Sequence, residues 1–206
     1  MLQSSLKILQ SLIIGLSIAV IPGPIFFELI RRTLTKGLLN GVLLVIGEFV
    51  GNFVLLLLIF FGLSPVLINP IVKSILTIMG GSILLKLGIF ALQLKKEEVS
   101  LSYDKKINAG KSFLSGFGIA VTSPIVIALW ISLSGSYLSV LHNNFLSFFH
   151  IFLIAFGFLL FFLPLAIIVH YTRHRIPPKY VVYLSRVFGT VLIMYAAVLF
   201  YGLIKG

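Results

Sequence analysis

Long stretches without a charged residue constrain this chain more than any other feature of its sequence. Residues 8–27, 49–72 and 187–204 contain no Asp, Glu, Lys or Arg, and the longer run 112–172 contains none either. A transmembrane helix needs about 20 predominantly apolar residues. The polar segment LHNNF (141–145) divides the longest run, so the sequence predicts six transmembrane helices, near 8–30, 37–63, 68–94, 112–138, 145–171 and 181–204.

The composition indicates an all-α integral membrane protein. Of the 206 residues, 59% are hydrophobic and only 10% are charged, with a mean hydropathy of +1.17. So few charges could not cover the surface of a soluble domain. The runs are continuously apolar rather than alternating, which argues against a β-barrel. The first run lacks a small-x-small cleavage site, so we expect a retained helix and not a signal peptide.

Basic residues gather in alternate loops of the predicted topology. Twelve of the 16 Lys and Arg residues follow the first, third and fifth predicted helices: Arg31, Arg32, Lys36, Lys95, Lys96, Lys105, Lys106, Lys111, Arg173, Arg175, Lys179 and Arg186. Cytoplasmic loops of membrane proteins carry an excess of Lys and Arg. We therefore expect a multi-pass protein of the plasma or inner membrane, with loops 1, 3 and 5 in the cytoplasm and both termini outside. The net charge of +11 needs no nucleic-acid partner.

Part of the chain is repeated. GLSIAVIPGPIFFEL (15–29) and GFGIAVTSPIVIALW (116–130) share a glycine, an Ile-Ala-Val triplet and, after a one-residue gap, Pro-Ile. The glycines, Gly15 and Gly116, are offset by 101 residues. Gly47 has a counterpart in Gly157, at an offset of 110 residues. Chance similarity among apolar helices is the alternative explanation.

The repeat divides the chain into residues 1–94 and 112–206, joined by the charged connector 95–111. The third helix of each unit adds a weaker match, between GSILLKLGIFA (81–91) and GTVLIMYAAVL (189–199). Because each unit has three spans, the second enters the membrane from the opposite side. The sequence thus predicts two inverted three-helix repeats, an arrangement common among secondary transporters.

Prolines interrupt the first helix of each unit. Pro22, Gly23 and Pro24 fall inside the first apolar run, and Ser123 and Pro124 fall at the matching place in the fourth. Proline removes a helix hydrogen bond, and an unpaired carbonyl facing lipid costs several kcal/mol. We expect helices 1 and 4 to be broken here, with their free backbone groups at a central cavity. A proline kink relieved by neighbouring helices is the alternative.

Four motifs in this order resemble the LysE-type family of amino-acid exporters, which are small six-helix inner-membrane proteins. The motifs are PGPIFFELIRRTLTKG (22–37), GEFVGNF (47–53), MGGSILLKLGIFALQ (79–93) and TSPIVIALW (122–130). The resemblance covers nearly the whole chain. This sequence departs from the family pattern at Ser123, where Asn is usual, at Ile125, where Lys is common, and at Glu28, where an apolar residue is usual.

Charged residues within apolar runs are functional candidates, because a charge inside the bilayer is costly unless it is paired or hydrated. Glu48 is the strongest candidate, with Asn52 one turn away on the same helix face. Glu28 either lines the cytoplasmic approach or forms a salt bridge with Arg32. Lys86 either pairs with a glutamate or snorkels to an interface. The candidate substrate or ion site comprises Glu48, Asn52, Pro22, Gly23, Pro24, Ser123, Pro124, Glu28, Lys86 and Trp130.

The resemblance implies a secondary transporter, not an enzyme, that exports a small amino acid or related solute, with proton or ion antiport as the expected coupling. The sequence has no Walker A pattern and no cysteine, so we expect no ATP use, no cofactor and no cysteine metal site. Expected partners are a small-molecule substrate, a coupling ion and the lipid bilayer. A divalent metal-cation exporter of the same superfamily and a membrane-embedded enzyme are the alternatives. Glycine faces at 37–41 and 47–51 suit either a homodimer or internal packing.

Overall fold

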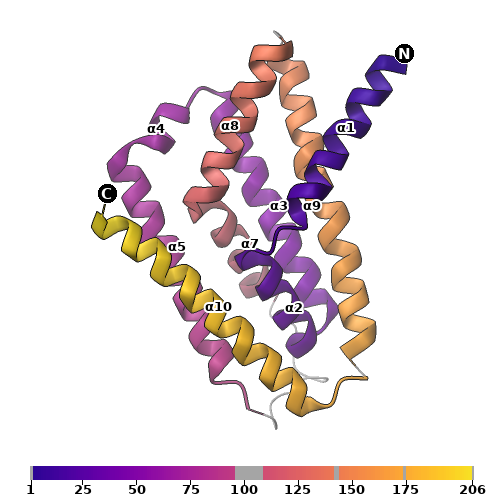
Figure 1. Ribbon diagram of the computed structural model, residues 1–206, viewed down its shortest axis with the longest axis vertical. Helices are drawn as coiled ribbons and strands as arrows, with labels where there is room; N and C mark the ends of the chain where they lie inside the picture. Colours follow the sequence, from indigo (N-terminus) through magenta and orange to yellow (C-terminus); the bar gives the residue numbers. More distant parts are fainter. Residues whose placement is uncertain (1, 96–108, 142–143, 174, 206) are drawn as a thin grey trace.

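The computed structural model describes residues 2–95, 109–141, 144–173 and 175–205, and the regular secondary structure within them is all helical, as predicted (Figure 1). Its helices are α1 (Leu2–Ala19), α2 (Pro24–Lys36), α3 (Leu38–Phe60), α4 (Ser64–Ile68), α5 (Pro70–Leu92), α7 (Ala109–Thr122), α8 (Pro124–Leu141), α9 (Asn144–Arg173) and α10 (Pro178–Lys205). Most of the predicted connector, 96–108, lies outside the described residues.

Among the described helices, four are long and apolar enough to cross a membrane by themselves: α3, α5, α9 and α10. Two further helix pairs meet the same test together, each bent at a short break. The angle is 73° between α1 and α2 and 62° between α7 and α8. The described residues therefore contain four candidate membrane spans, or six if each bent pair counts as one span.

Local sequence sets the helix boundaries near the ends of the bundle. Gly37 separates α2 from α3 with a φ of 87°, a left-handed conformation that glycine adopts without a steric cost. Asn69 caps α5, because its Oδ1 accepts a hydrogen bond from the Ile71 N–H at 3.0 Å and Pro70 is preorganised for the first helical position. The short helix α4 was not predicted, since the sequence between 61 and 69 lacks a helical repeat.

Three long side-by-side pairs organise the bundle: α1 with α9, α3 with α7, and α5 with α10 (Figure 1). Glycines allow each pair to approach closely. A Cβ atom at Gly15 would overlap the Ile154 carbonyl oxygen, and one at Gly116 would overlap that of Leu44. In the third pair, a Cβ atom at Gly88 would lie 2.8 Å from the Gly189 carbonyl oxygen. Small residues support such contacts between membrane helices.

The predicted glycine faces are used inside the subunit. A Cβ atom at Gly41 would overlap the Thr33 side chain, and one at Gly47 would overlap the Phe113 carbonyl. Of the two uses considered for these faces, internal packing accounts for both.

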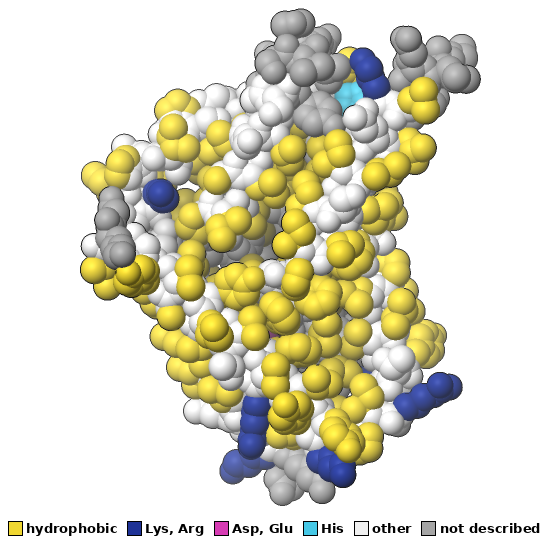
Figure 2. Space-filling view, in the orientation of Figure 1, with side chains coloured by type: hydrophobic (Ala, Val, Ile, Leu, Met, Phe, Trp, Pro, Cys, Tyr) yellow, Lys and Arg dark blue, Asp and Glu magenta, His cyan; other side chains and the backbone are white. Residues whose placement is uncertain are grey.

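The surface is largely apolar, as a lipid environment requires. Large side chains such as Phe61, Ile71 and Phe145 are more than 70% exposed. Figure 2 shows hydrophobic side chains over most of one face, while Lys and Arg gather chiefly toward its lower end. That end holds the α2–α3 junction and the start of α10 (Figure 1).

Candidate functional site

A cavity of about 380 Å³ is lined by residues of both helix breaks. Pro22, Gly23 and Pro24 line it from the α1–α2 break, and Ser123 lines it from the α7–α8 break. The remaining helices complete its walls, with lining residues that include Glu48, Gly80, Leu84, Ile119, Phe158, Phe162, Tyr195 and Leu199. Helix ends leave backbone groups without partners in the helix. The cavity therefore brings apolar walls and the backbone of two helix breaks to one place.

Glu48 brings a carboxyl group to this cavity from the middle of α3, and it is only 6% exposed. Gly47 lies directly before Glu48, and Gly51 lies about one helical turn after it. A Cβ atom at Gly51 would lie 2.8 Å from the Ala120 Cβ, so α3 and α7 lie close together here. Burying a carboxyl group within the membrane costs free energy, so Glu48 is a functional candidate by default.

A hydrogen-bond relay orients the Glu48 side chain. Asn52 Nδ2 donates to Glu48 Oε1 at 3.2 Å, and Trp130 Nε1 donates to Asn52 Oδ1 at 3.0 Å. The indole N–H can only donate, so it requires the amide oxygen of Asn52 to face Trp130 and the amide nitrogen to face Glu48. Asn52 and Trp130 do not line the cavity but lie behind Glu48, fully buried.

The α1–α2 break also has a partner on α10. The Tyr195 hydroxyl, which lies at the cavity, donates to the Pro22 carbonyl oxygen at 3.0 Å. This bond satisfies a carbonyl that no helix includes, so the break does not leave that oxygen facing lipid. It also links α10 directly to the backbone at the cavity.

The α7–α8 break presents its two candidate residues to different cavities. Ser123 faces the main cavity, and its carbonyl oxygen accepts from the Ile127 N–H at 3.0 Å. Pro124 instead lines a smaller cavity of about 180 Å³, together with Lys73 of α5. The break thus separates these neighbours in space.

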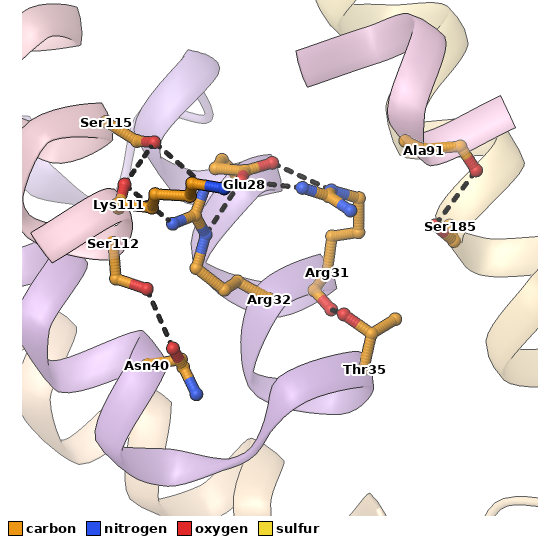
Figure 3. Close-up of polar contacts among 10 residues, drawn as sticks. All are labelled: Glu28, Arg31, Arg32, Thr35, Asn40, Ala91, Lys111, Ser112, Ser115 and Ser185. Atoms are coloured by element: carbon orange, nitrogen blue, oxygen red, sulfur yellow. Dashed lines mark hydrogen bonds and ion pairs between the residues drawn. The ribbon is translucent and has the colours of Figure 1, made fainter. Parts of the chain in front are cut away.

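Glu28 lies outside the cavity, in a buried cluster of charges shown in Figure 3. It accepts from Arg31 Nε at 2.8 Å and from Arg32 Nε at 2.9 Å, and its side chain is 0% exposed. Arg32 also donates to the Lys111 carbonyl oxygen at 3.3 Å and to the Ser115 Oγ at 3.1 Å. Glu28 therefore makes the salt bridge that its spacing from Arg32 allows, and the cluster ties α2 to α7.

Residues 16–203 match the sequence model of a family described as LysE: LysE type translocator. The chain belongs to the LysE type translocator family. It is also 30% identical, over 132 residues, to a protein of Bacillus subtilis (strain 168) named "Putative amino acid efflux protein YcgF". That match covers 64% of this chain and 63% of the length of the relative. No solved structure gives a significant match.

The remaining candidate of this LysE type translocator, Lys86, lies away from the cavity. It is exposed on α5 and does not line the cavity. Across the described residues, no three His, Cys, Asp or Glu side chains lie close enough together to hold a metal ion. The candidates that share the cavity are Glu48, Pro22, Gly23, Pro24 and Ser123.

Four residues that line the cavity were not predicted from the sequence: Tyr195, Thr122, Phe158 and Phe162. Tyr195 is one of seven tyrosines, and nothing in its local pattern distinguishes it from an interfacial tyrosine. Thr122 immediately precedes Ser123, so its position beside the predicted proline break could have identified it as a cavity residue.

Proposed function

We propose that this protein exports a small amino acid or a related solute through the cavity between its two helix breaks. The observation that carries the proposal is the Glu48 carboxyl group, buried at that cavity and oriented by Asn52 and Trp130. Membership of a translocator family and the name of the Bacillus subtilis relative support export of this kind of solute. Secondary transport through such a site requires only an ion gradient and alternating access.

Glu48 has the chemistry for coupling export to an inward proton. A buried carboxylate is stabilised by a cation beside it and disfavoured without one. A substrate ammonium group and a proton would then compete for the same carboxylate. Release of the substrate outside and uptake of a proton there would reset the site, which is antiport. Asn52 donates one hydrogen bond to Oε1 and so orients the carboxylate toward either cation.

We infer that the two three-helix units are an inverted repeat, and equivalent glycine contacts support this. Gly15 of α1 lies against Gly157 of α9, where a Cβ atom at Gly157 would be 2.9 Å from the Gly15 Cα. The corresponding residues are Gly116 of α7 and Gly47 of α3, and both sit at the backbone contact between those helices. The first helix of each unit therefore packs on the second helix of the other.

Two side-chain contacts made by serines are related by the same residue offsets between the two units. Ser112 Oγ donates to Asn40 Oδ1 at 2.9 Å (Figure 3), and Ser11 Oγ lies 2.8 Å from His150 Nδ1. The offset of 101 residues that relates Gly15 to Gly116 also relates Ser11 to Ser112. The offset of 110 that relates Gly47 to Gly157 also relates Asn40 to His150. α1 and α7 start at opposite ends of the bundle, so the equivalent contacts lie at opposite ends, as an inverted repeat requires (Figure 1).

This packing indicates which helices move during transport. A movement of the first three-helix unit away from the second would break the backbone contacts of α1 with α9 and of α3 with α7. The α5–α10 pair faces the cavity through Leu84 of α5 and Tyr195 and Leu199 of α10. Its close contact with α7 is at Gly80, where a Cβ atom would lie 2.6 Å from the Thr122 carbonyl oxygen. We propose that α5 and α10 move together over a four-helix core formed by α1, α3, α7 and α9. The end with most of the basic residues would face the cytoplasm.

Export from vesicles tests the proposed function. Glu48→Gln keeps the size and the hydrogen bonding of the side chain but removes its charge. We expect the variant to fold and to lose coupled efflux of amino acid from loaded proteoliposomes by about 100-fold or more, the scale of losing a buried charge–charge contact. The matched control is Arg186→Gln, which removes an exposed charge from α10. Equal efflux from Glu48→Gln and the natural sequence would overturn the proposal.

A further inference from the structure

The walls of the main cavity are almost entirely aliphatic or aromatic. Side chains that face it around Glu48 include Ile18, Leu84, Leu129, Phe158, Phe162 and Leu199. Apolar walls gain free energy by covering an apolar solute, at about 25 cal/mol for each Å² removed from water. They gain nothing from a polar side chain, which would lose its water without replacement.

The described lining contains one acidic side chain, Glu48, and no Lys, Arg or His side chain. An amino acid carries an ammonium group and a carboxylate. Glu48 balances the ammonium group. The first turns of α2 and α8, whose residues Ile25 and Ile125 line the cavity, offer backbone N–H groups without helix partners to the carboxylate. A lysine or arginine solute would bring a second cation into the apolar part of the cavity, and a glutamate or aspartate solute would bring a second anion. Moving an unpaired charge into such surroundings costs several kcal/mol.

The cavity volume agrees with a small solute. Sites for small molecules are about 300–1,000 Å³, and this cavity is near the lower limit at about 380 Å³. It has room for an amino acid with an uncharged side chain but is small for a peptide.

We propose that the cavity selects an amino acid with an uncharged aliphatic side chain. Its ammonium group lies at Glu48, its carboxylate at the N-terminal turns of α2 and α8, and its side chain against the apolar walls. Leucine and methionine fit this description, and a simple aliphatic amine shares their ammonium group and apolar body. The inference rests on the proposed function for the location of the site. It goes further by naming the class of substrate and by excluding basic and acidic amino acids.

Thermal unfolding of the full chain in lipid nanodiscs tests the inference, since a ligand that binds the folded state raises its melting temperature. Nanodiscs avoid detergent, which could occupy an apolar cavity. The probes are L-leucine, 3-methylbutan-1-amine, L-lysine and L-glutamate, each titrated against the natural sequence, Glu48→Gln and Arg186→Gln. We expect leucine and the amine to raise the melting temperature of the natural sequence and of Arg186→Gln. We expect Glu48→Gln to need at least about tenfold more of either ligand.

The outcomes separate the inference from the proposed function. Stabilisation by lysine or glutamate equal to that by leucine would overturn the substrate class while leaving amino-acid export standing. Stabilisation by the amine but not by leucine would overturn the carboxylate contact with the helix N-termini and would contradict export of amino acids. Stabilisation by leucine that is unchanged in Glu48→Gln would overturn the site, and no response to any probe would overturn the inference.

A change in the cavity wall provides a second test that does not depend on losing a signal. Leu129→Asp replaces an apolar side chain of the cavity wall with a second carboxylate. We expect L-lysine to stabilise this variant and L-leucine to stabilise it less than the natural sequence. Unchanged selectivity in a folded Leu129→Asp protein would contradict the role assigned to the apolar wall.

Discussion

Two buried glutamates show how neighbouring side chains decide what a carboxyl group does. Glu28 accepts hydrogen bonds from two arginines of its own helix and is covered completely. Glu48 has a single described hydrogen-bond donor, the neutral amide of Asn52, and it faces a cavity. A carboxylate neutralised by two guanidinium groups has no need of a further cation. Glu28 is therefore structural, whereas Glu48 is available to a solute.

Glu28→Gln should destabilise the protein and leave its ligand preference unchanged. The substitution leaves Arg31 and Arg32 buried without their carboxylate, and removing one partner of a buried ion pair costs about 3–5 kcal/mol. We expect a clearly lower midpoint of thermal unfolding than for Glu48→Gln, measured in the same nanodiscs. Leucine should still raise the midpoint of Glu28→Gln. A Glu28→Gln protein that is as stable as the natural sequence would contradict the structural role.

At the scale of helices, glycine contacts fix which elements stay together. The two equivalent contacts, at Gly15 and at Gly116, place the carbonyl oxygen of the neighbouring helix where a side chain would begin. These contacts leave no space for even a methyl group. The helices α1 and α9, and likewise α3 and α7, are thus held at a distance that only glycine allows.

Gly15→Ala and Gly116→Ala should each destabilise the fold, by about 1–3 kcal/mol, as overpacking of a filled core does. Gly135→Ala is the matched control, because nothing lies within 4 Å of a Cβ atom at Gly135 and alanine favours a helix. Thermal unfolding measures all three. The proposed repeat relates Gly15 to Gly116, so we expect their losses to be similar. A neutral Gly116→Ala would argue against close α3–α7 packing.

The sequence predicts features that depend on neighbours within one helix and misses those that depend on contacts between helices. Apolar runs located the helices, and the four-residue spacing of Glu48 and Asn52 placed them on one face, where they are hydrogen-bonded. The bond from Trp130 to Asn52 joins residues 78 apart, so no local pattern could orient the amide. The bond from Tyr195 to the Pro22 carbonyl spans 173 residues and was missed for the same reason.

At the scale of the whole molecule, the cavity lies between a core of four helices and the α5–α10 pair. In the alternating access that we propose, α5 and α10 stay together and shift relative to α7. The absence of cysteine from the sequence makes the idea accessible to cross-linking, because introduced cysteines are the only thiols.

Two cysteine pairs distinguish the moving part. Ser185 Oγ lies 3.2 Å from the Ala91 carbonyl oxygen, so cysteines at these positions would join α10 to α5. A Cβ atom at Gly118 would lie 2.9 Å from Ile83, so cysteines there would join α7 to α5. We expect a thiol cross-linker to leave efflux intact in the first pair and to abolish it in the second, with recovery after reduction. The reverse pattern would show that α5 and α10 separate during transport.

A structure of the protein with L-leucine bound in a lipid nanodisc would locate the substrate directly. We expect the ligand in the cavity between the two helix breaks, with its ammonium nitrogen within about 3 Å of a Glu48 carboxylate oxygen and its side chain against the apolar walls. Leucine bound elsewhere, or bound in the cavity with its ammonium group turned away from Glu48, would contradict the proposed export site.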